Sequence, residues 1–142
     1  MNKASEIALR VVLVIAGAFI VYTGIDMAFG GMRTLGWQVR GSFFEVTDSH
    51  TFLLQDSHFR FLSGVWLALG LLLVLGATNV SRYQHLLKLA FFLIFAGGLA
   101  RTTQLQPDIL FDPAIMGSFI AEILGMPILY GWVSTVAGQS SA

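Results

Sequence analysis

The 142-residue chain contains no cysteine, and only 11% of its residues are charged. The absence of cysteine excludes disulfides, thiolate metal sites, cysteine nucleophiles and iron–sulfur clusters held by cysteine. Soluble domains carry roughly a quarter charged residues, so the shortage of charge places this chain outside that class. The formal net charge is zero and there is no basic tail, so we expect no nucleic-acid partner.

Apolar residues make up 56% of the chain, and its mean hydropathy is +0.76. They gather in four segments, at residues 7–29, 59–77, 85–100 and 114–134. A membrane-spanning helix needs about 20 mostly apolar residues; the third segment is short, and Lys88 must extend its ammonium group to the nearer surface. We predict an all-α fold: an integral membrane four-helix bundle in the lipid bilayer, formed by a single membrane domain over residues 1–142.

The connections between the segments differ in length and chemistry. The first segment is expected to remain as a span, because no small-x-small cleavage site follows its apolar run. Residues 30–58 are predicted to form a long, partly ordered loop, too apolar to extend into water, that packs on the outer end of the bundle or lies in the membrane interface. "TNVSRYQ" is expected to be a tight polar turn, and Pro113 suits the first position of the fourth helix.

Charge predicts the orientation of the chain. The side with both termini carries Lys3, Glu6, Arg10, Arg82 and Lys88; the other carries Arg33, Arg40, Arg60 and Arg101 with Asp26, Glu45, Asp48, Asp56, Asp108 and Asp112. The Lys and Arg counts are equal, but Arg60 and Arg101 adjoin spans and are expected to pair with acids. Without these two arginines, the side with both termini has more Lys and Arg residues than the other side, which favours cytoplasmic termini in a bacterial inner membrane.

A small set of ionisable residues lies at the outer ends of the spans. Arg60 begins the second apolar segment, Arg101 ends the third, and Glu122 lies inside the fourth, about 12 Å from its outer end. A charged residue within a span should face the bundle or a partner, so Glu122 is expected within reach of Arg60 or Arg101. Asp56 and Arg60 are four residues apart and can pair on one helix face.

Two interpretations of this set remain open. Arg60, Arg101, Glu122 and His58 could line a pocket for an anionic or polar ligand, or the charges could form an internal ion-pair cluster that sets helix register. Beside Glu122, Gly117, Ala121 and Gly125 form a ridge of small residues, which predicts a close helix contact within the chain or with a partner.

The tripeptide Asp-Ser-His occurs twice, at residues 48–50 and 56–58. His50 and His58 would lie about 12 Å apart along a helix, too far to hold one metal ion, and His85 is expected at the opposite membrane face. Asp and Ser are common helix N-caps, so the repeat predicts two helix starts, a short outer helix and then the second span. We expect no metal, no haem and no other cofactor, with His58 kept as a candidate for the pocket rim.

Three short motifs resemble a family of small bacterial four-span membrane proteins, the domain-of-unknown-function family 4345. The motifs are Arg-Phe-x-x-Gly, Gly-Gly-x-x-Arg and Glu-Ile-x-x-x-Pro, formed here by Arg60, Phe61 and Gly64; Gly97, Gly98 and Arg101; and Glu122 and Pro127. The resemblance covers most of the chain and implies a membrane protein without a known activity.

The sequence leaves three functions open. No phosphate loop, zinc-protease motif or nucleophile elbow is present, so we expect no catalytic residue and favour a non-enzymatic accessory or assembly subunit that binds another membrane protein or a second copy of itself. The alternative is binding of an anionic lipid, quinone or small solute by Arg60, Arg101 and Glu122. A transporter is the third, and four spans would have to oligomerise to enclose a pathway.

Overall fold

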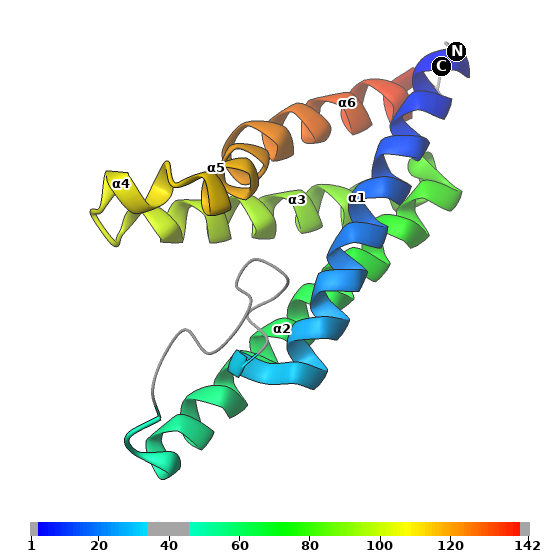
Figure 1. Ribbon diagram of the computed structural model, residues 1–142. Coiled ribbons are helices and arrows are strands. Elements are labelled where there is room, and N and C mark those ends of the chain that lie inside the picture. Colours follow the sequence, from blue (N-terminus) through cyan, green and yellow to red (C-terminus); the bar gives the residue numbers. More distant parts are fainter. Residues whose placement is uncertain (1–2, 34–45, 140–142) are drawn as a thin grey trace. The chain divides into compact units, whose positions relative to one another are not determined.

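The computed structural model describes residues 3–33 and 46–139 (Figure 1). Helix accounts for 92% of them and none is in a strand, so the predicted all-α class is confirmed for this part of the chain. The elements are α1 (Lys3–Gly30), the 3-10 turn η1 (Gly31–Arg33), α2 (Ser49–Thr78), α3 (Val80–Thr102), α4 (Pro107–Leu110), α5 (Pro113–Ile120), the π-helical turn η3 (Ala121–Gly125) and α6 (Met126–Gln139).

Four helical stretches are long and apolar enough to cross a membrane: Lys3–Arg33, Ser49–Thr78, Val80–Thr102 and Pro113–Gln139. They contain the four predicted segments. Large apolar side chains lie on the outside of each, among them Ile15, Phe61, Phe92 and Ile128. Helices satisfy their backbone groups internally, which lets such a surface face hydrocarbon.

The helix ends differ from the predicted boundaries. A single non-helical residue, Asn79, separates α2 from α3, where a longer polar turn was predicted. Its side chain accepts a hydrogen bond of 3.0 Å from the Arg82 N–H, so one cap suffices to start α3. The predicted start at Pro113 is confirmed: Pro113 follows the N-cap Asp112, whose carboxylate accepts from the Ala114 N–H at 2.8 Å.

The prediction of two helix starts in the Asp-Ser-His repeat is wrong. The first Asp does cap: Asp48 accepts from the N–H groups of His50 and Thr51, and the Thr51 hydroxyl bonded to it holds the pKa of Asp48 below its usual value. Asp56, however, lies inside the continuous helix α2. Its carboxylate binds Arg60 and the Met32 N–H rather than the N–H groups of a helix start.

As a result, α2 takes up residues 49–58, which the sequence assigned to the loop. The loop residues Trp37, Phe43 and Phe44, which were expected to pack on the bundle or the interface, lie outside the described residues.

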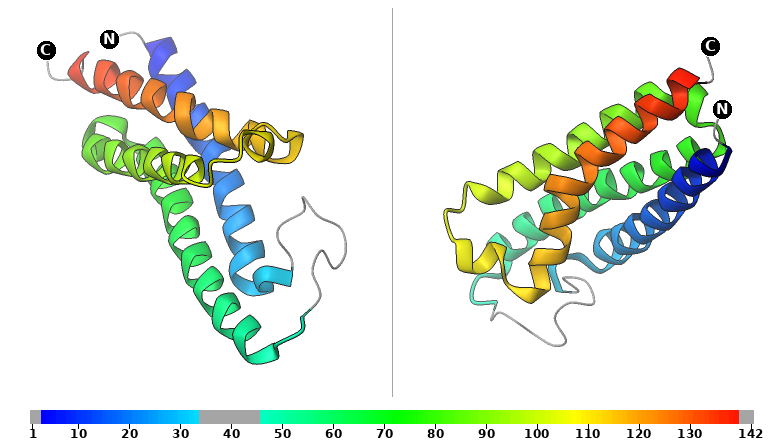
Figure 2. Two further views of the ribbon diagram at one scale, coloured as in Figure 1. Left: turned by 90° about the vertical axis from the view of Figure 1, so that its left-hand side faces the viewer. Right: turned by 90° about the horizontal axis from the view of Figure 1, so that it is seen from above.

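The chain divides into two compact units, each described by itself: the first unit is residues 1–13 and 75–142, and the second unit is residues 14–74. In the second unit, α1 and α2 lie side by side (Figures 1 and 2). Glycines bring the two backbones together, because a Cβ on Gly70 would lie 2.8 Å from the Val21 nitrogen and 2.9 Å from the Gly17 carbonyl oxygen. The Trp66 indole N–H also donates to the Thr23 hydroxyl at 3.1 Å.

In the first unit, α3 packs along α6 and η3 (Figure 2). The core of this unit includes the apolar side chains of Leu87, Phe91 and Val133, which are almost fully covered. The start of α1 joins this unit through a hydrogen bond of 2.9 Å from the Trp132 indole N–H to the Ser5 hydroxyl. This packing positions the end of α3 against η3, where the candidate site lies.

The contact between α1 and α2 predicts opposite effects for two glycines of α2. Gly70→Ala should lower the free energy of unfolding by about 1 to 3 kcal/mol, because the added methyl group meets backbone atoms of α1. Thermal or denaturant unfolding in mild detergent measures this. Gly64→Ala is the matched control: no described atom lies within 4 Å of a Cβ there, and stability should stay level or rise by up to about 1 kcal/mol. Equal stability of both variants would refute the close contact.

Candidate functional site

The centre of the candidate site is an ion pair between Arg101 and Glu122 in the first unit. The Arg101 Nε donates to Glu122 Oε2 at 2.8 Å, and Nη2 donates to Oε1 at 3.1 Å. This two-point geometry is the strongest form of the arginine–carboxylate interaction. The Glu122 side chain is 8% exposed and that of Arg101 is 42% exposed, so the acid is covered while the base reaches the surface. The sequence left Arg60 and Arg101 open as partners of Glu122, and the structure assigns Arg101.

Local sequence explains why these two side chains meet. Gly98 and Arg101 are three residues apart and share one face of α3. A Cβ on Gly98 would lie 2.8 Å from the Glu122 Cβ, a distance that real Cβ atoms do not reach. The glycine therefore lets η3 come close, and the arginine one turn later neutralises the carboxylate that this approach buries.

Glu122 also lies in a π-helical turn, which the sequence analysis did not predict. The Met126 N–H bonds to the Ala121 carbonyl, five residues back, and Pro127 has no N–H to offer. Within the helix, the donor for the Glu122 carbonyl would be the N–H of Met126 or of residue 127. Met126 uses its N–H for Ala121 and Pro127 has none, so the Glu122 carbonyl has no backbone partner in its own helix. Pro127, five residues after the intramembrane Glu122, could have indicated the π turn from the sequence. Such turns often occur beside interruptions of this kind and at functional positions.

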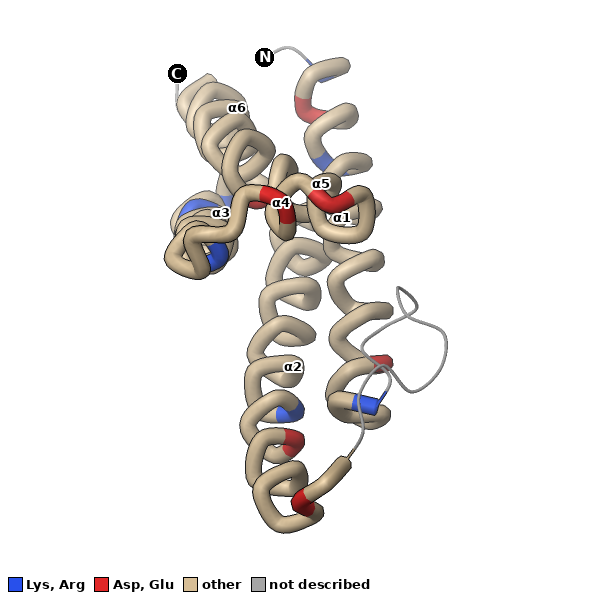
Figure 3. The backbone as a smooth tube through the Cα atoms, turned by 60° about the vertical axis from the view of Figure 1, so that its left-hand side comes forward, with Lys and Arg blue, Asp and Glu red and all other residues tan. Residues whose placement is uncertain are grey.

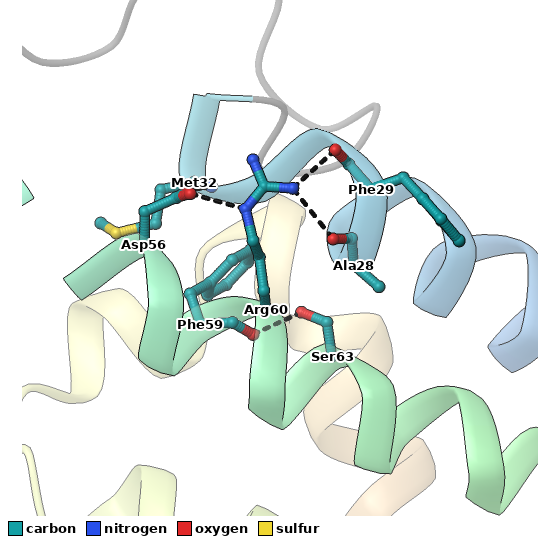
Figure 4. A network of polar contacts seen from close by, with 7 residues as sticks. All are labelled: Ala28, Phe29, Met32, Asp56, Phe59, Arg60 and Ser63. Atoms are coloured by element: carbon teal, nitrogen blue, oxygen red, sulfur yellow. Dashed lines mark hydrogen bonds and ion pairs between the residues drawn. The ribbon is translucent and has the colours of Figure 1, made fainter. Parts of the chain in front are cut away.

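A second polar network lies at the end of α1 in the second unit (Figure 4). Arg60 donates through Nε to Asp56 at 2.6 Å, and through Nη1 to the carbonyl oxygens of Ala28 at 3.1 Å and Phe29 at 2.7 Å. The last carbonyls of a helix have no partner within it. Arg60 therefore caps α1 from the neighbouring helix, and its positive charge complements the negative end of the helix dipole.

Gly31 completes this cap. Its φ is +69°, a left-handed conformation common just after a helix and easy only for glycine. A Cβ there would collide with the Asp56 carboxylate and come within 2.5 Å of the Arg60 Nη2. The next residue, Met32, donates its N–H to Asp56 at 2.6 Å. The network thus provides hydrogen-bond partners for the carbonyls of Ala28 and Phe29 and for the Met32 N–H just beyond the helix.

The histidines do not gather. His50, His58 and His85 are exposed, and no group of three or more potential metal ligands occurs in the part of the chain that the structure describes. His58 lies on α2 two residues before Arg60, in the second unit, whereas Arg101 and Glu122 belong to the first. The pocket expected from Arg60, Arg101, Glu122 and His58 draws on both units and stays a prediction.

The small-residue ridge of the fourth span makes no close helix contact among the described residues. A Cβ on Gly117 would have no atom within 4 Å, and a Cβ on Gly125 would have only the Ala121 Cβ of the same ridge, at 4.0 Å. Gly117 and Ala121 are exposed. The close contact within the first unit is made by Gly98 instead, so the ridge remains available to a partner.

The Arg101–Glu122 pair predicts strong coupling in a double-mutant cycle. Glu122→Gln and Arg101→Gln should each destabilise the protein, and the coupling energy should reach about 1.5 to 3 kcal/mol, because each substitution leaves a charged partner behind. Unfolding in detergent measures it. The control cycle combines Glu122→Gln with Lys88→Gln, thirteen residues before Arg101 on α3, and should be additive. Additivity in both cycles would show that the pair is not formed.

Comparison with known proteins places this architecture in a family. The chain matches no curated protein and no solved structure. The sequence model of one family, described as a domain of unknown function (DUF4345), matches residues 8–133. This range includes the Arg60–Asp56 and Arg101–Glu122 ion pairs, the Gly98 approach and the π turn. The chain therefore belongs to the DUF4345 family.

Proposed function

We propose that the chain is a non-enzymatic accessory or assembly subunit of the bacterial inner membrane, which binds another membrane protein through the outer surface of α5, η3 and α6. The observation that carries the proposal is the ridge beside Glu122 on this surface, where Gly117 and Ala121 are exposed and a Cβ on Gly117 would have no described atom within 4 Å.

The exposed surface of α5, η3 and α6 suits a helix. Only 17% of the most apolar window of this span is buried, against 28 to 33% for the other three spans. Gly117 and Ala121 are exposed, and small residues let a second backbone approach closely. The charges nearby are already engaged, since Glu122 pairs with Arg101. These features favour a docking role over a chemical one.

A second candidate is the binding of an anionic lipid, quinone or small solute by the polar residues Arg60, Arg101 and Glu122. The observation that favours it is the exposure of the two guanidinium groups, 41% for Arg60 and 42% for Arg101. Arg101 uses Nε and Nη2 for Glu122, and Arg60 uses Nε and Nη1 for its partners. One terminal nitrogen of each arginine is therefore left to donate to a ligand.

Purification from native membranes in mild detergent tests the proposal. A stoichiometric protein partner should accompany the wild-type chain, and Gly117→Leu should release it by blocking close approach.

Gly97→Leu is the control, since Gly97 on α3 is also exposed and has no described atom within 4 Å of its Cβ position. That variant should keep the partner. A bound small molecule in place of a protein would favour the second candidate. Equal loss of the partner with Gly97→Leu, or no partner for the wild type, would contradict the accessory role.

The proposal includes both termini in the cytoplasm, supported by the excess of Lys and Arg on their side once Arg60 and Arg101, which pair with acids, are set aside. The chain has no native cysteine, so single cysteines can report the orientation. In intact cells an impermeant thiol reagent should label the Ser42→Cys variant, and it should label the Ser140→Cys variant only after lysis. The reverse pattern would invert the topology.

A further inference from the structure

A separate feature of the first unit is the set of basic residues where α1 and α3 begin, beside the end of α6; Figure 3 colours the Lys and Arg positions along the backbone blue. This basic end consists of Lys3, Arg10, Arg82 and Lys88. Among the described residues of these helix ends, Glu6 is the carboxylate, and it pairs with Arg10 at 2.6 Å. Four cations against one carboxylate leave a net charge of plus three.

Two contacts bring the basic parts of α1 and α3 to the same helix, α6. The Trp132 indole N–H donates to the Ser5 hydroxyl at 2.9 Å, which fixes the first turns of α1 beside the last turns of α6. The Lys88 Nζ lies 5.4 Å from the centre of the Tyr130 ring, so α3 contributes its ammonium group next to the same part of α6. α1 and α3 thus present their basic residues beside α6, which carries none itself.

The aromatic neighbours mark this end as membrane interface. Arg82 lies over the ring of Tyr83, with 5.4 Å from its guanidinium carbon to the ring centre. Tyr and Trp side chains concentrate at the level of the lipid headgroups, where one edge is apolar and the other is wet. Lys88 lies about 9 Å below Arg82 along α3, a distance that its long side chain bridges by extending toward the surface.

We infer that the basic end binds the headgroups of anionic phospholipids. Apolar helices continue directly from it into the span, so the cations lie where the phosphate groups of a bilayer lie. Rings hold two of the cations, Arg82 and Lys88, and a ring contact leaves the positive charge available to an anion. The surface is complementary to a negatively charged leaflet. Each Lys or Arg near such a leaflet strengthens binding about fivefold. This inference is independent of the accessory role.

Electron spin resonance with spin-labelled lipids tests the inference on the reconstituted full-length protein. The wild type should associate with phosphatidylglycerol more strongly than with phosphatidylcholine. Arg82→Gln and Lys88→Gln should each reduce that preference about fivefold. Arg82→Lys should retain it, because the charge is kept, and this variant separates a charge effect from a packing effect.

Arg33→Gln is the matched control. Arg33 is also exposed and lies over an aromatic ring, 5.2 Å from the centre of Phe52, but it belongs to the second unit and not to the basic end. Its loss should leave the preference unchanged. A wild type without preference, or an equal reduction by Arg33→Gln, would overturn the inference. Abolition of the preference by inorganic phosphate at constant ionic strength would also overturn it, since the site would then bind a free anion rather than a lipid surface.

Discussion

The scarcity of polar partners inside hydrocarbon is the constraint on which the rest of this structure depends. A carboxylate in a span needs a cation, because no water is present to stabilise its charge. Glu122 meets this requirement with Arg101. This ion pair requires α3 and η3 to lie in contact. The contact requires a glycine at position 98, and Glu122 belongs to the π turn that faces this glycine. One charge thereby determines the packing of η3 on α3.

The second unit meets the same constraint at a helix end. The last carbonyls of α1 need donors, and Arg60 supplies them from α2 while Asp56 neutralises the arginine. In both units the carboxylate of the ion pair is well covered, whereas the arginine keeps part of its side chain exposed at the surface. The interactions proposed with other molecules use outer surfaces instead: the uncovered face of α5, η3 and α6, and the basic end of the first unit.

Much of the fold could be predicted from the chain alone, and the reasons for the failures are physical. Long apolar runs predict spans, because only helices satisfy the backbone without water. The continuity of α2 through Asp56 could not be predicted, since Asp and Ser cap helices when their side chains bind local N–H groups. Here the Asp56 carboxylate binds Met32 and Arg60 instead, and Met32 is distant in sequence. The glycines that make close contacts among the described residues include Gly98, Gly17 and Gly70, which the sequence did not single out for this role. The contact predicted for Gly117 remains possible only with a partner and stays a prediction.

The sequence by itself determined the all-α class, the helices apolar enough to cross a membrane and the residues that needed partners, because hydrophobicity and charge are properties of each residue. Only the tertiary structure decided which partner each received. Arg101 rather than Arg60 reached Glu122, and Arg60 became the cap of α1. Hydrogen bonds require donor and acceptor within about 3 Å, and positions of that accuracy arise only when helices distant in the chain have packed together.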